Sequence, residues 1–300
     1  MLVTLGVLCL IGFGILSLMG SLLDRLQEVA QEPPRMPSVT SPPVLRTDGP
    51  GESQPPAAEP QEWRLPDRTW PAIPPANSSD PNWTVVQTSE LYAVPFPAHT
   101  GCPPPGYAYE YSEMESYVTQ QMACTQKAWR EVQAQLGYST ADIPVYFFRG
   151  EGVSSACGYV EAPAFYCSAE GGKIYFGQGT LDWGTFQPFG MKDMATHEFG
   201  HHLQAQAGFF DALYYLGSGN EIIRRSELQA TCFGHGMIGR DDSFLMDEAH
   251  YQALVDKHQQ VLVDGTHGSN ASNDFWGFRG LSAGSLAECN TWTSPSSDVE

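Results

Sequence analysis

The residues His197-Glu198-Phe199-Gly200-His201 form an H-E-x-x-H motif within a stretch whose composition favours helix. On an α-helix, two histidines four residues apart project from the same face, one turn above each other. Two neutral imidazoles at this spacing can share a Zn²⁺ ion, and a glutamate beside the first can take a proton from a metal-bound water. The motif therefore predicts that His197 and His201 are metal ligands and that Glu198 is a general base.

A catalytic zinc site needs a third protein ligand and one open position. A third histidine at the spacing H-E-x-x-H-x-x-G-x-x-H is excluded, because Gln204 and Ala207 stand where that pattern has glycine and histidine. The other common solution is a glutamate on a later helix. The candidates downstream are Glu221, Glu227 and Glu248.

Glu227 is the best of these three candidates. It lies in a predicted helix over residues 220–238, and its neighbours three, four and seven positions later are small. These neighbours are Ala230, Thr231 and Gly234. A carboxylate on a face of small residues can approach another helix closely. Glu221 stands at the start of the helix, where the helix dipole alone favours an acidic residue, and Glu248 belongs to a later charged helix that is expected to face solvent.

Four blocks of residues, taken in order, are more specific than the pentapeptide. They are Ala156–Gly158 through Phe165–Cys167 with Lys173–Phe176; His197–Gln204; Ser226–Phe233; and Thr266–Ser269 with Arg279–Gly280 and Cys289–Thr291. These blocks span about half of the chain and resemble the neutral zinc metallopeptidase family of bacteria. The resemblance implies a zincin fold with Zn²⁺ as the cofactor. The chemistry expected of such a site is attack of water on a peptide carbonyl, so the expected partner is a peptide or protein substrate. The resemblance also implies that His197, His201 and Glu227 are the zinc ligands and that Glu198 is the general base.

The resemblance bears on two further residues. His267, in the last block, corresponds to a candidate donor to the oxyanion of the transition state; the alternative is a loop histidine that holds its turn by hydrogen bonding. The family usually has aspartate after Glu-Leu-Gln-Ala, where this chain has Thr231. An acidic residue at that position can orient a ligating histidine. Either the activity of this chain is weaker, or another residue takes over the orienting role.

The cysteines favour an exported protein. Cys9 lies in the apolar N-terminal segment, and the other six form an even set without any C-x-x-C pair, so a structural zinc site made of cysteines is not expected. We expect three disulfides: Cys157–Cys167 as a local loop, Cys232–Cys289 between the helix of Glu227 and the C-terminal region, and Cys102–Cys124. The alternative is six buried thiols in a cytosolic protein.

The overall charge excludes one class of partner. The chain has 300 residues and a formal net charge of −19. Nucleic-acid binding needs a basic surface, so we expect no nucleic-acid partner. The charge gives no support to binding of an anionic lipid surface either.

The N-terminal region predicts a membrane segment followed by a spacer. Residues 1–23 contain no charged side chain, and about 20 apolar residues suffice for a helix to span a bilayer. We expect a single-pass anchor with the catalytic domain outside the cytoplasm; the alternative is a cleaved signal and a secreted protein, although no basic start or small-x-small cleavage site is visible. Arg25 and Arg35 follow the segment, which conflicts with the positive-inside rule unless the true start codon lies upstream.

Residues 24–82 are expected to form a disordered linker, because 14 of the 23 prolines lie between Gln31 and Pro81. The folded domain is then residues 83–300. Helices are predicted at residues 113–136, 190–207, 220–238, 245–263 and 273–281, and strands at residues 143–148 and 173–176. A small sheet followed by helices indicates an α+β, zincin-like metallopeptidase domain with a helical active-site core. The strand near Ile174 is expected to offer its edge to an extended peptide. Tyr214 and Tyr215 are expected to pack in the core; the alternative is that one of them, instead of His267, donates to the oxyanion.

Three functions fit these residues. The first is a zinc endopeptidase outside the cytoplasmic membrane. The second is a catalytically degenerate zincin that acts as a binding module, which the threonine at Thr231 supports and the intact set of zinc ligands and base opposes. The third is a zinc amidase acting on cell-wall peptide, which requires the same ligands.

Overall fold

The computed structural model describes residues 63–261 and 263–300. The expected membrane segment at residues 1–23 and most of the expected linker lie outside the described residues. Within the described ranges, no helix is both long and apolar enough to cross a membrane.

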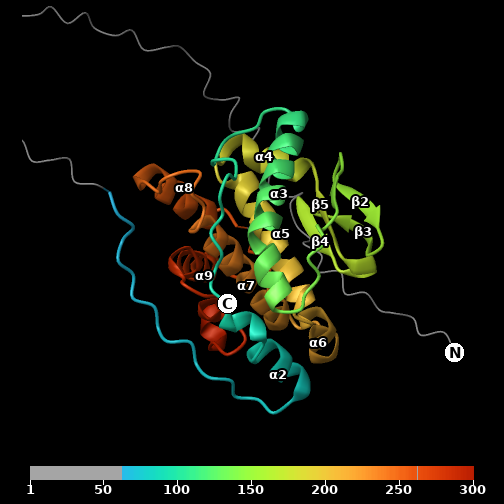
Figure 1. Ribbon diagram of the computed structural model, residues 1–300, viewed down its shortest axis with the longest axis vertical. Helices are drawn as coiled ribbons and strands as arrows, with labels where there is room; N and C mark the ends of the chain where they lie inside the picture. Colours follow the sequence, from blue (N-terminus) through green and yellow to red (C-terminus); the bar gives the residue numbers. More distant parts are fainter. Residues whose placement is uncertain (1–62, 262) are drawn as a thin grey trace, which may run out of the picture. The chain divides into compact units, whose positions relative to one another are not determined.

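The described chain combines a small sheet with a larger set of helices, as the α+β prediction requires (Figure 1). The helices are α2 (Pro81–Gln87), α3 (Tyr111–Gln135), α4 (Gln178–Phe186), α5 (Gly190–Gln206), α6 (Phe209–Leu216), α7 (Asn220–Ile238), α8 (Glu248–His258) and α9 (Asn270–Ser282). The strands are β1 (Val145–Phe147), β2 (Gly152–Ser155), β3 (Gly158–Glu161), β4 (Ala164–Cys167) and β5 (Lys173–Phe176). Figure 1 shows the strands on one side of α3 and α5, with α7, α8 and α9 on the other.

The sheet contradicts one expectation. Its strand order is β1-β5-β4, with β1 parallel and β4 antiparallel to β5, so the strand that contains Ile174 lies in the centre and has no free edge. Within the described residues the edge strand beside α5 is β4, and β2 and β3 form a separate hairpin. The central position explains why Ile174 and Phe176 are fully buried.

The helix α3 shows how local sequence sets an element. The carboxylate of Glu113 accepts hydrogen bonds from the backbone N–H groups of Tyr109 (2.8 Å) and Glu110 (3.1 Å), which satisfies donors at the start of the helix. Gly137 follows the last turn with a φ of +72°, a left-handed conformation that glycine adopts without strain. The inward face carries Met114, Val118, Met122 and Trp129, all buried. The predicted helix at residues 113–136 is thus confirmed to within a few residues.

The helices α5 and α7 approach each other closely because glycines lie between them. A Cβ added at Gly200 would lie 3.1 Å from the backbone oxygen of Ala230, and one added at Gly234 would lie 3.0 Å from the backbone nitrogen of His197. Both distances are shorter than a comfortable contact between carbon and a heavy atom. The absence of side chains at these two positions therefore lets the two helices that carry the motif residues pack backbone to backbone.

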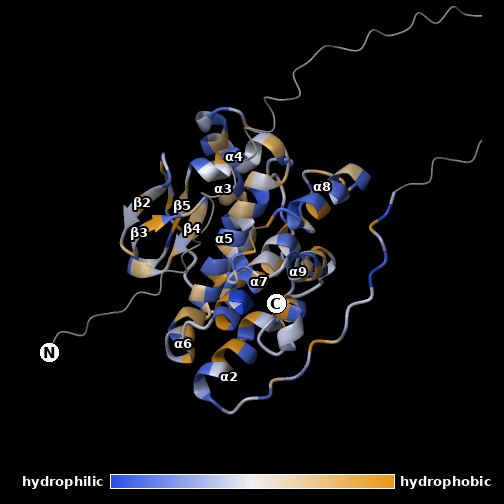
Figure 2. Cartoon of the chain, turned by 180° about the vertical axis from the view of Figure 1, so that it is seen from behind, coloured by the Kyte–Doolittle hydropathy of each residue, from blue (hydrophilic) through white to orange (hydrophobic). Residues whose placement is uncertain are grey.

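The helix α5 is polar although it lies in the middle of the fold. Figure 2 shows it largely in hydrophilic colours, and its buried polar residues are Lys192, Asp193, Thr196, Glu198, His201, His202 and Gln204. Buried polar groups are costly unless they are paired. Lys192 forms an ion pair with Asp241, and Asp193 forms one with Lys257. The helix therefore combines paired polar groups with an apolar face of Met191, Ala195, Phe199 and Leu203 in the main core.

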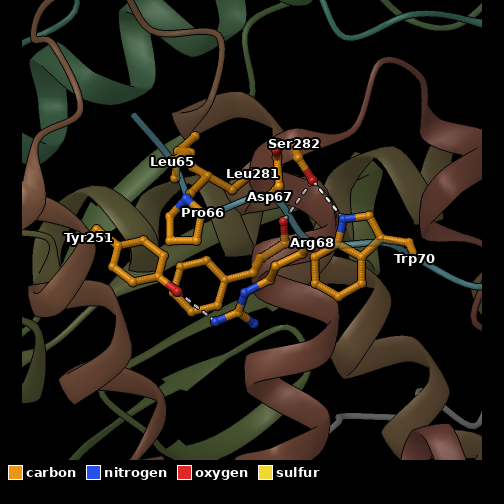
Figure 3. A pocket seen from close by; sticks show the side chains of 9 residues that line it. Leu65, Pro66, Asp67, Arg68, Trp70, Tyr251, Leu281 and Ser282 are labelled. Atoms are coloured by element: carbon orange, nitrogen blue, oxygen red, sulfur yellow. Dashed lines mark hydrogen bonds between the residues drawn. The ribbon is translucent and has the colours of Figure 1, made fainter. Parts of the chain in front are cut away.

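The folded part begins earlier than residue 83, because Leu65–Glu300 belongs to one compact unit. Arg68 donates to Asp274 of α9 at 2.9 Å, and the indole of Trp70 donates to Ser282 at 2.9 Å. Figure 3 shows these two side chains against the helices, with the guanidinium of Arg68 directed at Tyr251 of α8. The boundary expected at Trp83 is therefore wrong: the proline-rich composition continues into a segment whose few aromatic and charged side chains dock on α8 and α9.

The boundaries of the last two helices also differ from the prediction. The helix expected at residues 245–263 is α8, which begins after the N-cap residue Asp247, whose side chain accepts from the N–H of His250. The helix α9 begins earlier than expected, at Asn270, because the side chain of Ser269 caps it.

The three expected disulfides are present: Cys102–Cys124, Cys157–Cys167 and Cys232–Cys289. The last of these joins the middle of α7 to the segment that follows α9.

Candidate metal centre

Three side chains from α5 and α7 converge on one point. The Nε2 atoms of His197 and His201 lie 3.1 Å apart, and each lies 3.2 Å from Oε2 of Glu227. Zinc bonds of about 2.0–2.1 Å in a tetrahedral arrangement place neighbouring ligand atoms about 3.3 Å apart. The spacing of the three atoms therefore matches three corners of a tetrahedral zinc site, and within the described residues this is the group of side chains arranged to hold a metal ion.

The chemistry of the three atoms also fits a cation. A neutral imidazole has one protonated nitrogen, and the other nitrogen presents a lone pair. When the outer nitrogens of His197 and His201 carry the protons, two lone pairs and a carboxylate oxygen face one another. Such a cluster repels itself unless a positive charge lies between its members. The residues present therefore fit a divalent metal ion with nitrogen and oxygen ligands.

The other two candidate glutamates lie elsewhere. Glu221 forms an ion pair with Arg225 at 2.7 Å and accepts a hydrogen bond from Ser296. Glu248 is exposed in the first turn of α8. The structure thus brings only Glu227, of these three, to the paired histidines.

Glu198 lies near the three converging side chains but is not one of them, and it interacts electrostatically with His201 and Glu227. It is 6% exposed, and its Oε2 atom has no hydrogen-bond partner among the described residues. Burial raises the pKa of this carboxyl to about 7; nearby Glu227 acts in the same direction, whereas His201 and a backbone hydrogen bond from Tyr166 oppose the shift. A carboxyl with a pKa near neutrality can both accept and return a proton, as a general base requires.

The converging residues shift one another's pKa values. Burial works to raise the pKa of Glu227, but the adjacent His201 and the hydrogen bond to His197 outweigh it and hold that pKa well below its usual range. Burial works to lower the pKa of His201, and Glu227 outweighs it and raises the pKa to about 9. The pKa of His197 is lowered, chiefly by burial. A pKa well below its usual range keeps the Glu227 carboxylate ionised, which is the form that binds a metal ion.

His267 lies at the edge of this cluster. Its Nε2 is 3.8 Å from Oε2 of Glu227, and its Nδ1 donates to Oδ2 of Asp264 at 2.9 Å. The other oxygen of Asp264 accepts from the backbone N–H groups of Thr266 and His267. Burial works to lower the pKa of His267, but the hydrogen bond to Asp264 and the charge of Glu227 raise it. Since Nδ1 donates to Asp264, Nε2 bears a proton only when the ring is the imidazolium, the form that the raised pKa favours. In that form the loop presents a donor toward the cluster, and hydrogen bonding within the turn occurs as well.

The position of Thr231 matches the expected orienting role, although its contact is weak. Its hydroxyl lies 3.4 Å from Nδ1 of His197, at the long limit for a hydrogen bond. The nearby acidic residue is Asp193, one turn before His197 on α5, whose charge favours a protonated His197. Its carboxylate also pairs with Lys257 and lies 3.4 Å from Nδ1 of His235.

An aromatic wall lies beside the histidines. The ring of Tyr166, on β4, stacks on Phe210 at 5.8 Å, and Phe210 lies 6.2 Å from the ring of His201. The prediction that Tyr214 and Tyr215 pack in the core is wrong, since they are 53% and 72% exposed. The apolar face of α6 is instead supplied by Phe209, Ala212 and Leu213, which are buried.

Two residues that belong to the site were not identified from the sequence. Asp264 precedes His267 by three positions, and an aspartate before a Gly-Thr-His turn is a signal for a side chain that caps the turn. Tyr166 alternates with the buried Phe165 and Cys167 in a strand that was not predicted, so its contact with Glu198 followed only from the sheet.

Comparisons with known proteins agree with this geometry. Residues 104–292 match the family described as "Putative neutral zinc metallopeptidase". The chain is also similar to the "Uncharacterized protein YpfJ" of Escherichia coli strain K12 and of strain CFT073 of serotype O6:H1, with 28% identity over 199 residues in each case. Each alignment covers 57% of this chain and 69% of the relative. No solved structure matches the chain. Because the family match covers more than half of the chain, the protein belongs to the neutral zinc metallopeptidase family, whose cofactor is Zn²⁺.

Proposed function

We propose that the protein hydrolyses peptide bonds in peptides or proteins outside the cytoplasm, with zinc held by His197, His201 and Glu227. The observation that carries this proposal is the convergence of the three ligand atoms, 3.1–3.2 Å apart, beside an unpaired carboxylate oxygen of Glu198. A pure binding surface has no need of a buried carboxyl whose pKa is raised to about 7.

When bound, zinc polarises a carbonyl oxygen and makes water more acidic. Glu198 is the group that takes the proton from the attacking water at its free Oε2 and later delivers that proton to the leaving amine. Its buried position keeps bulk water away from the carboxyl, and Tyr166 holds it through a backbone hydrogen bond. No covalent bond between substrate and protein is needed.

His267 is suited to stabilise the negative charge that develops on the carbonyl oxygen. Asp264 holds its ring so that Nε2 faces the cluster and favours a proton on the ring. The strand β4 is an edge strand that contacts α5, and an extended substrate can pair with such an edge through its backbone. This assigns substrate docking to β4 and not to the central strand β5.

The disulfides support the proposed location. Three disulfides form readily in an oxidising compartment and are rare in the cytosol of most organisms. The proposed membrane anchor at residues 1–23 is tested separately, by fractionating cells and asking whether the full chain is recovered with membranes or in the medium.

The activity is tested with the full chain in three forms: wild type, Glu198→Gln and, as a matched control, Glu248→Gln on the exposed start of α8. Each is analysed for bound zinc and then incubated with a broad library of peptides. We expect about one zinc per chain in all three forms, and cleavage that falls at least about 100-fold in Glu198→Gln alone.

Equal cleavage by wild type and Glu198→Gln would remove Glu198 from the mechanism. Zinc binding without cleavage of any peptide by the wild type would favour a binding module. Cleavage restricted to cell-wall peptides would identify an amidase. A wild type that binds no zinc would refute the metal site itself.

A further inference from the structure

Gln204 lies one turn after His201 and joins the two helices of the site. Its side chain is fully buried. Its Oε1 lies 2.8 Å from Nδ1 of His201 and 3.1 Å from the hydroxyl of Ser226. Its Nε2 lies 2.8 Å from the backbone oxygen of Ser226 and 3.0 Å from Oε1 of Gln229. All four polar contacts of this amide are therefore made inside the protein.

The partners determine which way the amide of Gln204 faces. A backbone carbonyl can only accept a hydrogen bond, so the atom that faces the oxygen of Ser226 must be the NH₂ group. The amide oxygen then faces His201, and Nδ1 of His201 must carry the proton that this oxygen accepts. In a neutral imidazole, Nε2 is consequently unprotonated, with its lone pair directed at Glu227 and His197. The tautomer that binds a metal through Nε2 is thus imposed by the fold.

The orientation of Gln229 is fixed in the same way. Its Oε1 accepts from the indole N–H of Trp292 at 3.1 Å, a group that can only donate. Its Nε2 lies 3.2 Å from the backbone oxygen of Cys289, which can only accept, and 2.9 Å from the hydroxyl of Tyr92. Because both protons of the Gln229 amide are used in this way, Gln229 can only accept from Gln204, through its Oε1 atom. The chain of hydrogen bonds therefore runs from the C-terminal segment to the ligand His201.

The same amide also affects the third ligand. Ser226 precedes Glu227 and Gln229 follows it by two positions, and both are bonded to Gln204. One side chain on α5 thus holds the stretch of α7 that carries the ligand carboxylate. Because the amide is neutral, it does so without adding a further negative charge beside Glu227.

We propose that Gln204 is a positioning residue for the zinc site: it holds His201 in the tautomer with a free Nε2 and sets the position of Glu227 relative to it. This inference rests on the proposed zinc site and adds a residue that touches neither substrate nor metal. Partners of metal-ligating histidines of this kind usually change metal affinity about 10- to 100-fold when they are removed.

The test uses the full chain with Gln204→Met, Gln204→Glu and the control Gln206→Met. Gln206 lies on the same helix and also bonds through its amide, to Gln133 and to the backbone of Ser139, but it does not contact the site. Zinc affinity is measured by competition with a chromogenic chelator, thermal unfolding is followed in the zinc-free proteins, and the visible spectrum of the cobalt-substituted proteins reports the geometry of the metal.

Gln204→Met removes both the acceptor for His201 and the donor to α7, so zinc affinity is expected to fall about 10- to 100-fold, with an altered cobalt spectrum. Gln204→Glu keeps the oxygen that accepts from His201 but loses the donor. We expect it to lower the unfolding temperature about as much as Gln204→Met but to lose less zinc affinity, because the tautomer of His201 is kept while the hold on α7 is lost. Gln206→Met is expected to bind zinc as the wild type does.

A purely structural role would lower stability and zinc affinity in parallel in both Gln204 variants, and that result would overturn the proposal. Wild-type affinity in Gln204→Met, or an equal loss in Gln206→Met, would overturn it as well. In each of these cases the wild type still binds zinc and cleaves peptides, so the proposed function stands. A wild type without zinc affinity would instead remove both.

Discussion

The crossing of α7 and α9 allows a sharp test of how tightly the helical core is packed. At Gly280 of α9, an added Cβ would lie 2.1 Å from the backbone oxygen of Cys232 on α7. A non-bonded contact needs well over 3 Å, so Gly280→Ala must separate the two helices by about 1 Å. The neighbouring residue Leu281 makes a similar approach, with its backbone oxygen 2.2 Å from a Cβ added at Gly239.

Two opposing effects decide whether Gly280→Ala raises or lowers the free energy of unfolding. Alanine is favoured over glycine within a helix by at most about 1 kcal/mol. Overpacking costs about 1–3 kcal/mol, and the upper end applies because the clash at Gly280 is with backbone, which no rotamer change can relieve. We therefore expect a net loss of about 1–2 kcal/mol, which corresponds to a fall in unfolding temperature of about 2–8 °C for a folded part of this size.

The assay is thermal unfolding of the zinc-free wild type, Gly280→Ala and the control Gly284→Ala. Gly284 lies just beyond α9, and a Cβ added there would meet its nearest neighbour, Oε1 of Glu288, at 3.6 Å, an ordinary contact. The control is expected to stay within about 0.5 kcal/mol of the wild type. An unfolding temperature for Gly280→Ala equal to or above that of the wild type would refute the argument, since it would mean that helix propensity outweighs the close crossing.

Three further predictions concern the site and its surroundings. His267→Leu should lower kcat about 100- to 1000-fold and leave the zinc content unchanged; loss of zinc would make His267 a ligand. Zinc at about 100 times its dissociation constant should stabilise the chelated protein by about 2.7 kcal/mol and raise its unfolding temperature by about 5–10 °C; an unchanged transition would argue against a site formed only in the folded state. Burial lowers the pKa of His235 to about 3 from an ordinary value of 6.5, so the unfolded chain binds a proton between these values while the folded chain does not. The contribution of His235 to the free energy of unfolding is therefore fully present above pH 6.5 and is lost as the pH falls below that value. In urea unfolding, the wild type should lose about 2 kcal/mol more than His235→Gln between pH 7 and pH 5; equal losses would contradict this.

Several elements were predictable because their signals are local. The helices α5 and α7 have the expected bounds to within one residue, and β5 matches its predicted range. The motif spacing placed His197 and His201 on one face of α5, which needs only the helical period. The three disulfide pairs that were expected among the possible pairings of six cysteines all occur, although only Cys157–Cys167 closes a short loop.

Other features depend on contacts between distant parts of the chain. The strand β4 was not expected. Only its pairing with β5 shows that β5 is central and that the backbone of Tyr166 is placed to hydrogen-bond Glu198. The segment with Arg68 and Trp70 has the composition of a linker, yet it docks on α8 and α9. Neither outcome follows from local composition, because a strand's place in a sheet and the docking of a few side chains are decided by partners far away in sequence.

The amino-acid sequence alone determined which side chains have the chemistry for a zinc site and which two of them share a helix face, because residue type and helical period are local properties. Tertiary structure decided the rest. Glu227 comes within 3.2 Å of both histidines because Gly200 and Gly234 let α5 and α7 pack backbone to backbone. The same packing removes Glu198 from water and so raises its pKa to about 7, a property that exists only once two helices and a strand have enclosed it.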